Sequence, residues 1–131
     1  MKTTVLFLMF VLSLSVCLNS QPNRDESKSV FSNKYAIDNL SAGIHGDNLG
    51  VKKGCIYYAG LYKVNQIFED LAEVLCENED DSIRKLTIIA MYRIDASRTV
   101  EFLKDFSKHC DNLKMKSFCL QVQNDFEFAN R

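Results

Sequence analysis

The chain has 131 residues, 47% of them hydrophobic and 25% charged, and its formal net charge is −1 at pH 7. This length fits a single domain. The near balance of acidic and basic side chains excludes the strongly basic surface that attracts nucleic acids or anionic membranes.

Residues 1–20 predict a secretory signal peptide. Lys2 precedes an apolar run from Val5 to about Leu14, and small and polar residues follow it. The run is shorter than a membrane-spanning helix, and this order of segments is typical of a cleaved leader. We therefore expect cleavage between Cys17 and Gln21, and a secreted, extracellular protein that keeps no integral membrane segment.

Residues 21–50 are expected to form a flexible N-terminal segment. Residues 21–29 are polar and include the only proline of the chain, so they have little to bury. Residues 30–44 have the spacing of a short amphipathic helix. All but one of the glycines lie between residues 43 and 54, which predicts a flexible connector around the start of the main domain, residues 51–131. Asn39 begins an Asn-Leu-Ser sequon, so we expect glycosylation of Asn39 at the surface.

The stretch from Cys55 to Cys76 has the clearest helical periodicity in the chain. Its apolar residues recur at intervals of three and four, which places them along one stripe of an α-helix with polar residues opposite. We expect a single helix that packs this stripe against other helices. The stripe consists of Tyr57, Leu61, Val64, Phe68, Leu71 and Leu75.

Residues 77–82 form an acidic turn whose Asp and Ser side chains are suited to cap the next helix. The spacing of its carboxylates does not match a calcium-binding EF-hand loop. The apolar residues that follow fit two interpretations, either one long helix from Asp81 to Cys110 or two helices with a break at residues 95–97. A last helix is expected from about Asn112. The fold class is therefore all-α, a small disulfide-stapled bundle of about four helices.

Cleavage of the leader removes Cys17 and leaves four cysteines, which in a secreted protein indicate two disulfides. No CxxC or similarly close ligand pair indicates a metal site. If one helix joins Cys55 to Cys76, their Cα atoms lie about 31 Å apart, whereas a disulfide requires less than about 7 Å. This excludes a Cys55–Cys76 bond. A break in the third helix would bring Cys76 and Cys110 to the same end, so we expect Cys76–Cys110 and Cys55–Cys119, whereas a continuous third helix would separate the first pair.

The sequence lacks the residue patterns that indicate an enzyme or a cofactor. Neither His45 nor His109 has a serine, cysteine or carboxylate at a spacing that builds a nucleophile–base pair, and phosphate-binding loops and HExxH are missing. Most aromatic residues are expected to fill the core. Tyr57, Tyr58 and Tyr62 are the candidates for a ligand or partner surface.

The cysteine framework has a distinctive order. It runs through Cys55, Ile56, Tyr57 and Tyr58, then Cys76 about twenty residues later, Cys110 after a stretch without glycine or proline, and a close final Cys119. Over residues 50–122 this order resembles the TsetseEP domain of secreted insect proteins. The resemblance implies a signal peptide, a small cysteine-linked α-helical domain and an extracellular role in an insect gut or reproductive tract, and it implies no reaction.

These observations predict a secreted, non-enzymatic binding protein with an extracellular partner, for example in defence or at an epithelial surface. No cofactor, metal or nucleic acid is expected. The alternative is an extracellular carrier of a small apolar ligand, lipid or odorant-like, held in a cavity between the helices.

Overall fold

The computed structural model describes residues 33–78 and 80–131, and within them every regular element is a helix. The expected all-α fold class is confirmed. The expected signal peptide, residues 1–20, lies outside the described residues. The elements are α3 Lys34–His45, α4 Leu49–Leu61, the 3₁₀ helix η1 Asn65–Ile67, α5 Phe68–Glu77, α6 Asp81–Ile94, α7 Ala96–His109 and α8 Leu113–Ala129.

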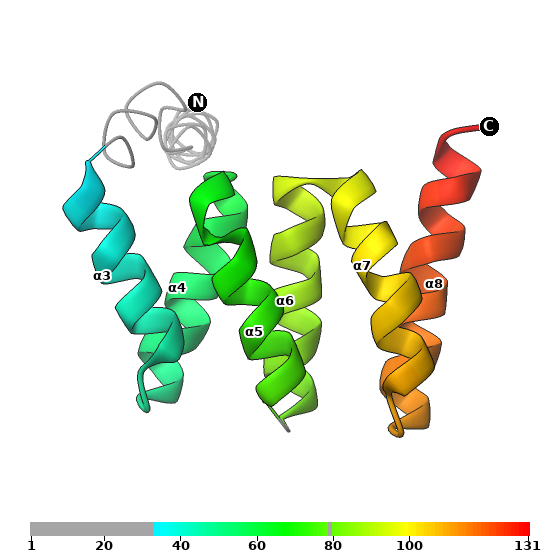
Figure 1. Cartoon of the computed structure of the whole chain (residues 1–131), viewed down its shortest axis with the longest axis horizontal. Helices are drawn as coiled ribbons and strands as arrows, with labels where there is room; N and C mark the ends of the chain where they lie inside the picture. Colours follow the sequence, from blue (N-terminus) through cyan, green and yellow to red (C-terminus); the bar gives the residue numbers. More distant parts are fainter. Residues whose placement is uncertain (1–32, 79) are drawn as a thin grey trace, which may run out of the picture.

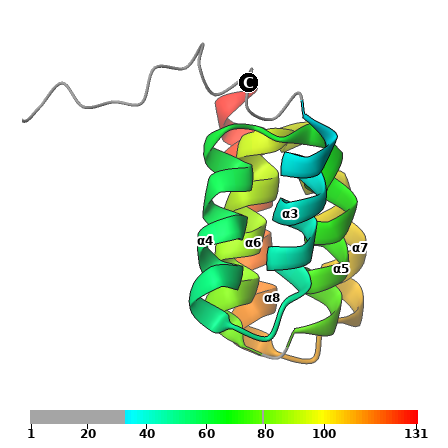
Figure 2. The same ribbon diagram turned by 90° about the vertical axis from the view of Figure 1, so that its left-hand side faces the viewer.

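The α-helices alternate in direction and form three hairpins, α3–α4, α5–α6 and α7–α8, which stand side by side along the longest dimension of the molecule (Figure 1). Seen along that dimension, α4, α6 and α8 follow one another on one side, and α3, α5 and α7 lie on the other (Figure 2). Helix α6 is central because it packs against α4, α5, α7 and α8.

The expected single helix from Cys55 to Cys76 is wrong. Helix α4 ends at Leu61, the chain turns back through Lys63 at a positive φ of 53°, and η1 leads into α5. A non-glycine residue in this left-handed region is uncommon, and no glycine or proline marks the turn in the sequence. The five α-helices α4 to α8 replace the four expected in the main domain, because the central stretch is a helix, a turn and a second helix.

Side-chain caps fix where the helices begin. Asp80 accepts hydrogen bonds from the backbone N–H groups of Ser82 and Ile83, which confirms that the acidic turn caps α6. Asp95 caps α7 in the same way, so the interpretation with two helices in place of one between residues 81 and 110 is confirmed. Asn112 caps α8 where the last helix was expected.

The glycines do not form a flexible connector. Gly43 lies in α3, Gly50 and Gly54 lie in α4, and only Gly46 falls in the short turn between these helices. Helix α3 buries Leu40 and Ile44 against the rest of the array, and the boundary expected at residue 50 falls inside α4. From residue 34 onward the expected flexible segment is therefore part of the packed fold.

One continuous core runs through the array. Its fully buried members include Ile56 of α4, Leu71 of α5, Met91 of α6, Leu103 of α7 and Met115 of α8. Each helix supplies apolar side chains on one face, so burial of these stripes stabilises the stacked hairpins. In the part of the chain that the structure describes, no helix is both long and apolar enough to cross a bilayer.

Candidate interaction surface

Three tyrosines around the C-terminal end of α4 form one aromatic cluster. The rings of Tyr57 and Tyr58 meet edge to face with centroids 5.5 Å apart, and those of Tyr58 and Tyr62 stack at 5.9 Å. Tyr57 and Tyr58 are 43% and 49% exposed, while Tyr62 is partly buried against the core. The structure thus brings together the three tyrosines that the sequence selected, and it holds each ring against a neighbour, which limits its freedom before any partner binds.

The exposed apolar area continues from α4 toward α6. Gly60 approaches Ala90 so closely that a Cβ added to the glycine would lie 2.7 Å from the Ala90 Cα. This contact sets the two helices side by side, and the residues next to it, Leu61 and Ile89, are 38% and 42% exposed. We call the set Tyr57, Tyr58, Leu61 and Ile89 the outer apolar surface.

A groove between α6 and α8 extends this surface. It has a volume of about 230 Å³, and apolar side chains form most of its wall. Arg93 and Asp125 add opposite charges, and neither forms an ion pair in the described part of the chain. The groove is lined by Ile88, Ile89, Tyr92, Arg93, Val122 and Asp125. The sequence did not predict this groove, because a gap between two helices depends on how the helices pack.

The four cysteines in the main domain are free thiols in the structure. Cys55 points toward α3, where its Sγ would clash with a Cβ added to Gly43. Because α6 lies between α4 and α8 (Figure 1), the structure does not bring Cys55 and Cys119 together. Cys76 and Cys110 end α5 and α7 at the same end of the array, as expected from the broken helix.

The distance that excluded a Cys55–Cys76 bond assumed one continuous helix, and this assumption is wrong. Excluding Cys55–Cys76 also excluded its complement, Cys110–Cys119, yet these two thiols are close enough for Cys110 to affect the ionisation of Cys119. Burial, together with the nearby Cys110 thiol, raises the pKa of Cys119 to about 11. Burial also raises the pKa of Cys76. High pKa values keep these sulfurs protonated at neutral pH and make them poor nucleophiles.

A polar cluster joins α3 to α5. The Ser41 hydroxyl donates to Asp70 Oδ1 at 2.8 Å, and His45 Nε2 lies 3.1 Å from the same oxygen. Both side chains contact the carboxylate, and the serine proton is directed at Asp70 and not at the histidine. This geometry ties the two helices together and does not form the serine–histidine pair that activates a nucleophile.

The remaining predicted site residues lie on the surface. Asn39 is exposed on α3, while Ser41 of its sequon contacts Asp70. His109 ends α7, with its Nδ1 3.1 Å from the carbonyl oxygen of Asp105. Among residues 33–78 and 80–131, no group of three His, Cys, Asp or Glu side chains is arranged to hold a metal ion.

Comparison with known proteins gives no relative. Neither a family model, a curated protein nor a solved structure matches the chain.

Proposed function

We propose that this is an exported, non-enzymatic binding protein that holds an extracellular protein partner on its outer apolar surface. The observation that carries the proposal is the stacked tyrosine cluster on α4, which exposes apolar area next to Leu61 and Ile89. Tyrosines are frequent anchors of protein interfaces, because they offer a large apolar ring and one polar group at a low cost in side-chain entropy. The resemblance to the TsetseEP domain supports the extracellular setting, and glycosylation at Asn39 fits it.

The adjoining groove favours a protein partner over a carried ligand. Its volume of about 230 Å³ is smaller than that of most cavities that enclose an organic ligand, roughly 300–1,000 Å³. A space of this size fits one large apolar side chain better than a lipid. The opposite charges of Arg93 and Asp125 would then select the residues that flank that side chain.

The proposal is tested by affinity capture from insect gut or reproductive-tract fluid, with bound proteins compared between variants by quantitative mass spectrometry. We expect the double substitution Tyr57→Ser and Tyr58→Ser to reduce capture of the true partner about tenfold or more, as loss of interface anchors does. Tyr35→Ser is the matched control, because Tyr35 on α3 is 75% exposed and lies outside the surface. Equal capture by all three proteins would refute the proposal.

The carrier alternative is tested on the same purified material. Solvent extraction followed by mass spectrometry would detect a stoichiometric lipid or odorant-like molecule if the protein were a carrier. N-terminal sequencing of protein secreted into the medium tests export, and we expect the mature chain to begin between residues 18 and 21.

A further inference from the structure

Helix α8 carries a second apolar stripe that the fold does not bury. Leu113 and Phe128 are each 79% exposed and Leu120 is 47% exposed, although α8 buries Met115 and Cys119 on its other face. The three exposed residues are separated by seven and eight positions, so they lie along one line of the helix.

The stripe faces away from the array. Helix α8 stands at one end of the row of helices (Figure 1), and it packs against α7 and α6. Small polar residues complete the line, since Ser117 and Asn124 lie one turn from Leu120 on either side and are exposed. The spacing of four, three, four and four residues from Leu113 to Phe128 is close to the seam of a coiled coil.

We propose that this stripe binds the same stripe of a second copy, so that two α8 helices pair antiparallel about a two-fold axis between Leu120 and Gln121. In this register Leu113 lies opposite Phe128 of the second copy, and Ser117 lies opposite its Asn124. The two Leu120 side chains meet at the axis. Every apolar residue of the stripe therefore faces an apolar residue, and the polar pair can form a hydrogen bond, as an isologous interface requires.

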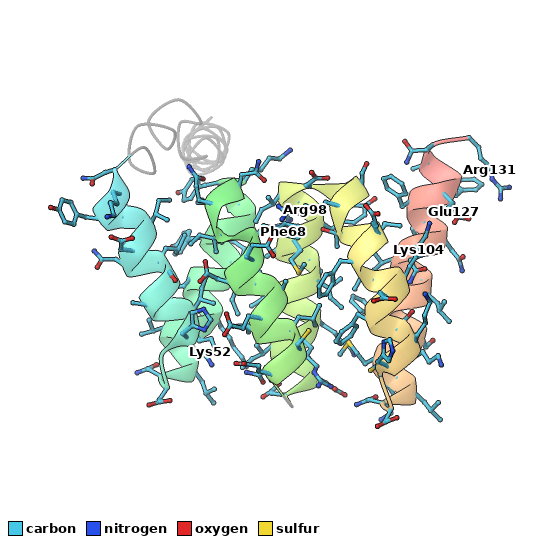
Figure 3. The ribbon with its side chains drawn as sticks, viewed as in Figure 1. Lys52, Phe68, Arg98, Lys104, Glu127 and Arg131 are labelled. Carbon is cyan, nitrogen blue, oxygen red and sulfur yellow. The ribbon has the colours of Figure 1, made fainter. Side chains whose placement is uncertain are left out.

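The charges beside the stripe fit the same register. The first half of α8 carries Lys114 and Lys116, and the second half carries Asp125 and Glu127. Figure 3 shows Glu127 on the last turns of α8 at the end of the array. By helix geometry Lys116 and Glu127 flank one side of the stripe, while Lys114 and Asp125 flank the other.

In the antiparallel pair, each lysine lies on the same side as an acidic residue of the second copy. The two positions are offset by two residues, or about 3 Å along the helix axis. Lys116 meets Glu127, and Lys114 meets Asp125, twice each by symmetry. A parallel pair would set lysines against lysines and acids against acids. The charge pattern thus selects the antiparallel dimer over the parallel one.

The area decides how stable this dimer is. Helix α8 has 17 residues and is about 25 Å long. One helix face of this length buries less than the roughly 1,200–2,000 Å² of a standard interface, so we expect a reversible dimer with a dissociation constant in the range of about 1–100 µM. The outer apolar surface lies on α4 and α6 and shares no residue with the stripe, although Asp125 beside the stripe also lines the adjoining groove, and the two proposals can fail separately.

The test uses two charge reversals, each in the full chain and measured by sedimentation equilibrium. Lys116→Glu sets glutamate against Glu127, and Glu127→Lys sets lysine against Lys116. We expect each variant alone to dimerise about tenfold more weakly than the native protein, because attraction becomes repulsion at two places. A mixture of the two variants should form a heterodimer at least as tight as the native dimer, since both contacts become complementary again.

A third variant tests the apolar contact. Leu120→Asp places two carboxylates at the two-fold axis, so this variant should remain monomeric at a protein concentration of 100 µM or above. Leu49→Asp is the matched control, since Leu49 on α4 is 56% exposed, and it should dimerise like the native protein. A native protein that stays monomeric at this concentration overturns the proposal. So does a dimer that Leu120→Asp leaves intact, or a mixture of the two charge variants that fails to associate.

Discussion

The close contact between α4 and α6 gives the sharpest test of the fold, through the substitution Gly60→Ala. An added Cβ would lie 2.7 Å from the Cα and 2.9 Å from the Cβ of Ala90. Ala90 has no side-chain torsion through which it could move away, so the two helices must separate. Overpacking of this kind costs about 1–3 kcal/mol, whereas removal of a helical glycine contributes only about 0.5–1 kcal/mol in the other direction. We expect the free energy of unfolding to fall by roughly 1–2 kcal/mol.

Gly54→Ala is the matched control, because Gly54 lies in the same helix and an added Cβ there meets no atom within 4 Å. It should stabilise the protein by about 0.5–1 kcal/mol through helix propensity alone. Urea unfolding followed by circular dichroism measures both variants, and unchanged m-values would confirm that only stability changes. If Gly60→Ala stabilises the protein as much as Gly54→Ala does, α4 and α6 do not pack this closely.

Three further predictions concern other contacts. In the native protein the Asp81 carboxylate accepts hydrogen bonds from the Asn112 side-chain amide. Asn112→Asp keeps the oxygen that caps α8 but sets a second carboxylate beside Asp81, so it should lower the free energy of unfolding by about 1–2 kcal/mol. The added change Asp81→Asn should restore most of this loss in thermal unfolding. The pKa of Cys119 is about 11 in the folded protein, against about 9 unfolded, so its contribution to stability is present below pH 9 and is lost between pH 9 and 11. Over this pH range the free energy of unfolding of Cys119→Ala should fall by about 1–2 kcal/mol less than that of the native protein. An equal fall in both proteins would contradict a buried free thiol. Arg98→Ala should lower the free energy of unfolding by about 1 kcal/mol in urea unfolding, because the guanidinium lies 4.0 Å from the ring centroid of Phe68 (Figure 3). No loss would show that the contact is too exposed to contribute.

Helix type and caps were predictable from the sequence because they depend on nearby residues. The acidic turn before Asp81 and the start at Asn112 each place an Asp or Asn side chain where it can accept from the free N–H groups of the next helix, as does Asp95 in one of the two interpretations of residues 81–110. Such signals span three or four residues, so one sequence is enough to read them.

The turn between α4 and α5 could not be predicted in the same way. It is made by Tyr62, Lys63 and Val64, none of which is a typical turn residue, and the helical spacing continues across it. The reversal allows α4 to pack against α6, with Gly60 against Ala90, and local spacing does not reveal a contact between segments so far apart in the sequence. The glycines between residues 43 and 54 were misinterpreted for a related reason, because Gly43 serves a close contact with Cys55 that the sequence does not reveal.

The residues that made the central helix look longer than it is are also the ones that the core does not use. Tyr57 and Leu61 continued the stripe that Phe68 and Leu71 bury, yet they remain 43% and 38% exposed. An apolar periodicity that exceeds what the fold buries leaves side chains that gain free energy only from another molecule. The stripe of α8 is a second case, since Leu120 keeps helical spacing without a partner inside the array. Apolar periodicity in this chain therefore accounts for two kinds of contact, those that form the hairpin array and those that we propose the array makes with other proteins.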